Sequence, residues 1–204
     1  MVGALPDDDP EAIVDDIDDL DDGQDGDAAR RPAGGPGRAP GWAGPSRGRW
    51  LLFTLIAVAV VAADQVTKSW ITGSVAPGSG FSVLGTWLNF VYGTNSGILF
   101  GMVPQSAGAF AVASLVVIAL IVVYHRKAGR GVVVSVAASL LLGGAIGNLI
   151  DRLRFGAVVD WIDMGIGQWR FWTYNVADAA ITTALILILA ATLFPGIAEW
   201  GSDD

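Results

Sequence analysis

The chain has 204 residues, of which 52% are apolar and only 16% charged, and its formal net charge is −8. A typical soluble domain carries roughly 25% charged residues, so this composition favours a membrane protein. The lack of cysteine excludes disulfides, thiolate nucleophiles and iron–sulfur sites, and the single histidine, His125, excludes multi-histidine metal sites and leaves little for a Ser-His-Asp triad.

Residues 1–49 are predicted to form a disordered cytoplasmic tail. Twelve of the twenty acidic residues lie within residues 1–27, and the part that follows is rich in Gly, Pro and Arg. Like charges repel, and too little apolar surface is available to offset the entropy of ordering. We therefore expect one folded domain at 50–195, followed by a short cytoplasmic tail at 196–204.

Four long apolar runs follow the tail. The first begins at Trp50 (WLLFTLIAVAVVAADQVTKSWI), and the others occupy 107–124, 132–150 and 176–194. Each approaches the roughly 20 residues that a helix needs to cross a bilayer. The runs predict an all-α membrane protein with four transmembrane helices.

The positive charges predict the orientation of these helices. Eight of the twelve Lys and Arg residues lie before the first run or between the second and third. Such residues are enriched on the cytoplasmic side, so both termini are expected there. The segments 72–106 and 151–175 then lie outside, and their strand-like sequences, FSVLGTWLNFVYGTNSG and QWRFWTYN, predict a small extracytoplasmic β-sheet at the membrane surface.

The acidic residues of the apolar region gather at one side of the membrane. All of them fall at or near the predicted extracytoplasmic ends of the helices. Ionisable residues at membrane depth are costly and therefore mark functional candidates. Between Trp50 and Pro195 they are Asp64, Asp151, Asp160, Asp163 and Asp178.

The spacing of the polar residues predicts local pairs. Asp64 and Lys68 are four residues apart on one helix face, which suits an ion pair. Asn175 lies three residues before Asp178 and can orient its carboxylate if a helix begins there.

Three polar residues share the face at the end of the third run. Asn148, Asp151 and Arg152 have helical spacing, and one interpretation is an Asp151–Arg152 ion pair that caps this helix. Two carboxylates brought together in a partly dry site would share one proton and could activate water against a carbonyl. The spacing does not say which two acids form that pair.

Other features have simpler interpretations. Gly143 and Gly147 form a GxxxG pattern, which we interpret as close helix packing. Asp163 is predicted to be a solvated loop acid. Aromatic residues around the loops are predicted to be interfacial anchors: Trp87, Trp161, Trp169, Trp172 and Tyr174.

Five segments together resemble the lipoprotein signal peptidase (signal peptidase II) family. They occur in the family's order and at the predicted helix ends. The segments are DQVTK at 64–68, NSGILF at 95–100, GGAIGNLIDR at 143–152, GAVVDW at 156–161 and YNVADA at 174–179.

The resemblance implies an aspartic endopeptidase that cleaves diacylglyceryl-modified prolipoproteins just before the lipidated cysteine. It implies a bacterial inner-membrane location and an active site at the extracytoplasmic face. The expected partners are prolipoproteins and membrane lipid, with no nucleic acid, no metal or organic cofactor, and a monomeric chain. The implied catalytic pair is Asp160 and Asp178; the implied supporting or substrate-positioning residues are Asp64, Lys68, Asn95, Asn148, Asp151, Arg152 and Asn175.

Alternative functions are also compatible with parts of the sequence. Lys68 could act as the base for Ser69 or Ser96 in a Ser–Lys peptidase. A proton-coupled transporter would place its acids at the bilayer midplane and is usually built from repeats, whereas these acids lie at helix ends. A non-enzymatic membrane scaffold would tolerate Asp160→Asn and Asp178→Asn.

Overall fold

This computed structural model describes residues 44–96, 107–128 and 131–201. Its four long helices are α1 (Arg47–Ser74), α2 (Ala107–Ala128), α3 (Val132–Phe155) and α4 (Val176–Leu193). Each is long and apolar enough to cross a membrane, so the four predicted spans are confirmed. The predicted disordered tail, except for residues 44–49, and the end of the NSGILF motif lie outside the described residues.

Local sequence signals explain where these helices begin and end. The Ser46 side chain accepts a hydrogen bond from Arg49 N, which caps the start of α1. At the end of α3, Gly156 adopts φ 71°, a left-handed conformation that favours glycine. Pro195 ends α4 and starts the short helix α5 (Pro195–Glu199), which was not predicted.

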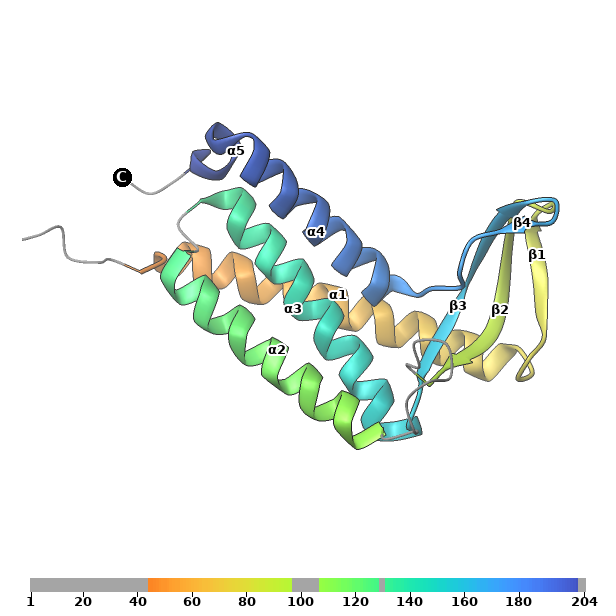
Figure 1. Ribbon diagram of the computed structural model, residues 1–204. Helices are drawn as coiled ribbons and strands as arrows, with labels where there is room; N and C mark the ends of the chain where they lie inside the picture. The colour runs from red at the N-terminus through yellow and green to blue at the C-terminus, as the bar shows by residue number, and fades with distance from the viewer. Residues whose placement is uncertain (1–43, 97–106, 129–130, 202–204) are drawn as a thin grey trace, which may run out of the picture. The chain divides into compact units, whose positions relative to one another are not determined.

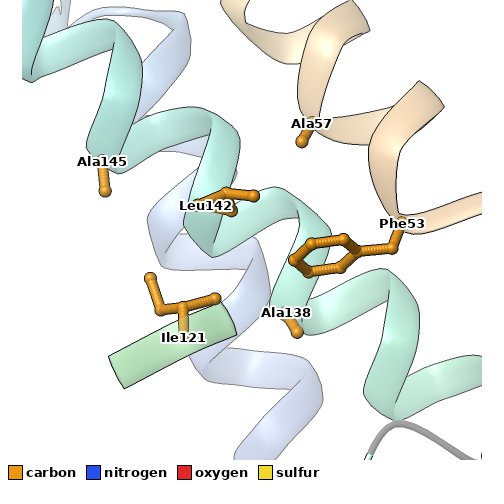
Figure 2. Packing of buried hydrophobic residues seen from close by; sticks show 6 residues of the cluster. All are labelled: Phe53, Ala57, Ile121, Ala138, Leu142 and Ala145. Carbon is orange, nitrogen blue, oxygen red and sulfur yellow. The ribbon is translucent and has the colours of Figure 1, made fainter. Parts of the chain in front are cut away.

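Helix α3 is the centre of the bundle and packs against α1, α2 and α4 (Figure 1). Its apolar contacts with α1 and α2 form a cluster of Phe53, Ala57, Ile121, Ala138, Leu142 and Ala145 (Figure 2). A Cβ at Gly143 would lie 2.7 Å from Val60 Cβ and 2.9 Å from the carbonyl oxygen of Ala57. The backbones approach closely at this glycine, which confirms the packing role predicted for it.

A four-stranded antiparallel sheet lies at the end of the bundle where α3 ends and α4 begins (Figure 1). Its strands are β1 (Gly80–Leu84), β2 (Leu88–Asn95), β3 (Val158–Ile166) and β4 (Trp169–Arg170), in that order. The strand-like run predicted within 72–106 forms β1 and β2, so this part of the predicted sheet is confirmed.

The prediction for the second outer segment needs correction. The QWRFWTYN run contributes only the two residues of β4 and one bridge from Tyr174 to Ile162. The nine-residue strand β3, which carries Asp160, was missed. Its first four residues are all buried, so they lack the alternation that marks a half-exposed strand.

An aromatic cluster joins the sheet to α1. The Trp161 ring lies edge-on to Phe90 with centroids 4.9 Å apart and to Trp70 with centroids 6.4 Å apart. Trp161 is only 7% exposed and packs with Ile71 and Val159, so its predicted role as an interfacial anchor is wrong. The cluster joins the strand that carries Asp160 to the C-terminal end of α1.

Candidate active site

Asp160 and Asp178 come from different elements and meet at the junction of sheet and bundle. Asp160 lies on β3 opposite Gly93 of β2, and Asp178 lies in the first turn of α4. Asn175 links them: its Nδ2 donates to Asp160 Oδ1 at 2.9 Å, and its Oδ1 accepts from Asp178 N at 2.9 Å. The backbone N of Asn175 in turn donates to Asp178 Oδ2 at 3.3 Å. This capping box confirms that Asn175 orients the Asp178 carboxylate.

A second asparagine connects the two aspartates to the helices. Asn148 of α3 donates from Nδ2 to Asp178 Oδ1 at 2.8 Å. Its Oδ1 accepts from both Asn175 Nδ2 and Lys68 Nζ, each at 3.2 Å. Each aspartate is therefore held by an asparagine, and the two asparagines are bonded to each other.

The surroundings favour the protonated form of one aspartate. Asp160 is 3% exposed, and burial together with the nearby negative charge of Asp178 raises its pKa to about 6. Hydrogen bonds from Asn95 and Asn175 and the charge of Lys68 act in the opposite direction. Two neighbouring carboxyl groups, of which Asp160 has the raised pKa, can hold one proton between them, which is the condition for paired acid and base chemistry.

A buried cluster of charged side chains adjoins Asp160 and Asp178 through Asn148. Lys68 Nζ is 2.8 Å from Asp64 Oδ2 and 2.8 Å from Asp151 Oδ2. The predicted Asp64–Lys68 pair is confirmed. The interpretation that Asp151 pairs with Arg152 is wrong: Asp151 faces Lys68, while the Arg152 guanidinium lies over the Phe110 ring. Helical spacing could not reveal this, because the partner of Asp151 comes from another helix.

The cluster also holds the backbone beside each aspartate. Asp64 Oδ1 accepts from Ala177 N at 3.0 Å, one residue before Asp178. Asp151 Oδ2 accepts from Val159 N at 3.0 Å, one residue before Asp160. The Asp64 and Asp151 side chains thus hold, by hydrogen bonds, the two chain segments that carry Asp178 and Asp160.

Gln65 was not among the predicted site residues. Its Nε2 lies 3.2 Å from Asp64 Oδ2, 3.0 Å from Asp151 Oδ1 and 3.2 Å from the carbonyl oxygen of Gly147. A Cβ at Gly147 would lie 2.6 Å from Asp64 Oδ2, so this glycine makes room for the cluster. The only sequence signal for Gln65 was its position next to Asp64 in the DQVTK segment.

The other predicted site residues differ in their distance from the pair. Asn95 hydrogen-bonds to Asp160 through its side chain, whereas Arg152 reaches only the carbonyl oxygen of Asn148, at 3.4 Å. Asp163 is not a free loop acid: it lies on β3 and pairs with Arg170 at 2.6 Å. Hydrogen bonding to Arg170 lowers the pKa of Asp163. Across residues 44–96, 107–128 and 131–201 no group of three or more His, Asp or Glu side chains is placed to hold a metal ion.

The position of Lys68 argues against its use as a catalytic base for serine. An ammonium has three protons, and three acceptors surround this one: Asp64, Asp151 and Asn148. Ser69, next in sequence, is exposed and lies outside this arrangement. Within the part of the chain that the structure describes, Lys68 contacts Asp64, Asp151 and Asn148 and bonds to neither Ser69 nor Ser96, so these contacts do not support the Ser–Lys alternative.

Comparison with known proteins decides the family. Residues 56–194 match the family described as signal peptidase (SPase) II. The chain belongs to the signal peptidase II family. The match includes strand β3, which carries Asp160, and the start of α4, which carries Asp178. This membrane chain is therefore a peptidase, and the transporter and scaffold alternatives are set aside.

Relatives and solved structures agree with membership of signal peptidase II. The lipoprotein signal peptidase of Staphylococcus carnosus (strain TM300) is 39% identical over 140 residues, covering 68% of this chain and 88% of the relative. That of Syntrophomonas wolfei is 35% identical, covering 69% and 91%. A solved bacterial membrane enzyme superposes with a TM-score of 0.68 at 34% identity, covering 75% of this chain and 97% of the other. A second such enzyme gives 0.68 at 32% identity, covering 79% and 98%.

Proposed function

We propose that this peptidase removes signal peptides from prolipoproteins whose lipobox cysteine carries a diacylglyceryl group, and that it cuts immediately before that cysteine. The relatives named lipoprotein signal peptidase support the substrate class. The observation that carries the chemistry is the buried Asp160 beside Asp178, each held by an asparagine at the end of the helical bundle. A substrate anchored by lipid would present its scissile bond at this level of the membrane.

The chemistry proposed for Asp160 and Asp178 is hydrolysis by a pair of carboxyl groups that shares one proton. Asp160, with its raised pKa, carries the proton and donates it to the oxygen of the scissile carbonyl. The ionised Asp178 takes a proton from water, whose oxygen attacks the carbonyl carbon. When the intermediate collapses, Asp178 returns that proton to the departing amine nitrogen. As the C–N bond breaks, Asp160 takes back a proton from one hydroxyl of the intermediate. The signal peptide leaves with a new carboxyl group, and the pair again holds one proton.

The proposal includes an orientation in a bacterial inner membrane. The sheet and the aspartate pair face the extracytoplasmic side, and both termini face the cytoplasm, as the Lys and Arg distribution indicates. Asp64, Lys68, Asn148, Asp151 and Asn175 support the aspartates, and the chain acts as a monomer. Asn95, which bonds to Asp160, and Arg152, which bonds to the carbonyl oxygen of Asn148, contribute to positioning the substrate.

The experiment that tests this function is a cleavage assay on the purified protein in detergent. The substrates are one prolipoprotein with and without its diacylglyceryl group, and the variants are Asp160→Asn and Asp178→Asn. We expect the parent to cleave only the lipidated substrate and neither folded variant to cleave it.

Two results would contradict the proposal in different ways. Cleavage that survives in both aspartate variants would refute the two-aspartate mechanism. Equal cleavage of the lipidated and unmodified substrates would refute the specificity. Arg170→Gln, which alters an ion pair on the sheet away from the aspartates, is the matched charge-removing control and should cleave normally.

A further inference from the structure

Gln65 occupies an unusual place among the buried acids. Its one amide nitrogen faces three acceptors, the carboxylates of Asp64 and Asp151 and the carbonyl oxygen of Gly147. It therefore joins α1 to α3 at two points, through Asp151 and through Gly147. Water can satisfy the amide of an exposed glutamine, whereas Gln65 is partly buried and its amide is satisfied by protein acceptors.

The charges around Gln65 explain why an amide is needed there. Lys68 supplies one positive charge against the two carboxylates, and its three protons are already directed at three acceptors. Asp151 Oδ1 lies 3.0 Å from Gln65 Nε2, so the amide gives this buried oxygen a neutral donor. A buried carboxylate oxygen without a donor is costly. The charged groups that face this region are Asp64 and Lys68 from α1 and Asp151 and Arg154 from α3, with Asp160 and Asp178 beyond the two asparagines.

The carboxylates that Gln65 holds are the same ones that hold the chain beside the central pair. Asp64 receives the backbone N–H of Ala177, and Asp151 receives that of Val159, both at 3.0 Å. Rotation of either carboxylate would release the residue immediately before Asp178 or Asp160. The position of each central aspartate thus depends on the orientation of a carboxylate that Gln65 fixes.

We propose that Gln65 is a positioning residue of the peptidase: its carboxamide locks Asp64 and Asp151, and these two set the separation of Asp160 and Asp178 through the backbone of Ala177 and Val159. This inference rests on the proposed function of the two aspartates. Gln65 itself touches neither of them. It borders a small cavity of about 190 Å³ that Ser69, Thr72 and Arg154 also line.

The test measures how strongly the two aspartates interact. Two close carboxyl groups give a bell-shaped pH–rate profile, and the interval between its limbs reports their mutual repulsion. The variants are Gln65→Met, which removes the donors at similar size, and Gln65→Glu, which keeps the shape and replaces Nε2 with an acceptor. Gln168→Met, at the exposed turn between β3 and β4, is the matched control.

We expect kcat to fall by about 10-fold in both Gln65 variants, because hydrogen bonds to charged groups contribute on that scale. KM should stay within about two-fold, since ground-state binding is untouched. The pH interval between the two limbs of the pH–rate profile should narrow, because Asp160 and Asp178 move apart once Asp64 and Asp151 are loosened. The pH–rate profile of Gln168→Met should match that of the parent.

The outcomes separate this inference from the proposed function. If the parent does not cleave the lipidated substrate, the proposed function fails. If the parent cleaves and both folded Gln65 variants keep the parental interval, the positioning role is refuted even when stability or kcat declines. If Gln65→Met does not fold, the interval of Gln65→Glu decides the question alone.

Discussion

Asn175 Nδ2 lies 2.9 Å from Asp160 Oδ1, so the residue that caps α4 also holds the aspartate on β3. The same nitrogen faces the carbonyl oxygen of Val159 and the Oδ1 of Asn148, each at 3.2 Å. One side chain thus connects the start of α4, the C-terminal part of α3 and strand β3 of the sheet. The amide nitrogen of Asn175 holds Asp160, and its amide oxygen caps α4. A mutation can therefore remove the contact with Asp160 and keep the helix cap.

Asn175→Asp should keep the helix cap and lose the activity. The carboxylate still accepts from Asp178 N, but its second oxygen would face the oxygens of Asp160, Val159 and Asn148. We expect cleavage to fall by about 100-fold, similar to the loss of a donor in other active sites. Asn175→Ser, which keeps a cap without an added charge, should retain more activity. Equal activity of Asn175→Asp and the parent would show that the amide donor is unimportant.

The pH dependence of cleavage follows from the pKa of Asp160. Burial and the charge of Asp178 raise that pKa to about 6, and the mechanism needs the proton that Asp160 carries. The value of kcat/KM should therefore decline as the pH rises through about 6, because the free enzyme then loses this proton. The corresponding limb of kcat should lie at higher pH, since bound substrate excludes more water. A kcat/KM that rises through this range would contradict the assignment.

Asp160→Asn should make the protein more stable at neutral pH while it abolishes cleavage. The folded-state pKa lies above the ordinary value of 3.8, so the folded protein binds more protons between pH 3.8 and about 6 than the unfolded chain does. Stability from this group is complete below pH 3.8 and is lost as the pH rises to about 6. Removing the charge should add up to about 3 kcal/mol at pH 7, from roughly two pKa units. Thermal unfolding in detergent at several pH values would measure this, and a destabilised variant at pH 7 would contradict it.

Lys68→Met should destabilise the protein far more than Arg170→Gln. Asp64 and Asp151 are 0% and 1% exposed, so loss of Lys68 leaves two buried carboxylates without their cation. Breaking a buried pair in this way costs about 3–5 kcal/mol, whereas a partly exposed pair such as Asp163–Arg170 contributes about 0–1 kcal/mol. Unfolding of both variants in the same detergent would give the comparison. Similar losses of unfolding free energy in the two variants would mean that the buried cluster of Asp64, Lys68 and Asp151 is not a rigid support for the aspartates.

Gly147→Ala should be costly although alanine favours a helix more than glycine does. The added Cβ would lie 2.6 Å from Asp64 Oδ2 and 3.3 Å from Ala177 Cβ. Such overpacking costs about 1–3 kcal/mol, and the shift of Asp64 should also lower cleavage. Gly73→Ala is the control, because its Cβ would meet nothing within 4 Å. If the two variants unfold at the same temperature, the close approach at Gly147 is not real.

Much of the fold was predictable from the sequence because it depends on local patterns. Four long apolar runs define membrane helices by length and composition alone. The Asp64–Lys68 pair follows from a four-residue helical spacing, and the Asn175 cap from a three-residue one. Such contacts lie within a single turn of helix, so the spacing of the residues determines them.

The tertiary structure decided the contacts between elements. Nothing in the spacing of α3 directs Asp151 to Lys68 rather than Arg152, because the partner arrives on another helix. Strand β3 was hidden because its buried start lacks alternation, and Trp161 was misassigned because its neighbours Phe90 and Trp70 come from distant segments. The sequence by itself determined a four-helix membrane peptidase and its candidate aspartates. Only the approach of α1, α3, α4 and β3 determined which groups hold those aspartates, because burial and hydrogen-bond partners are set by the packing of segments far apart in the chain.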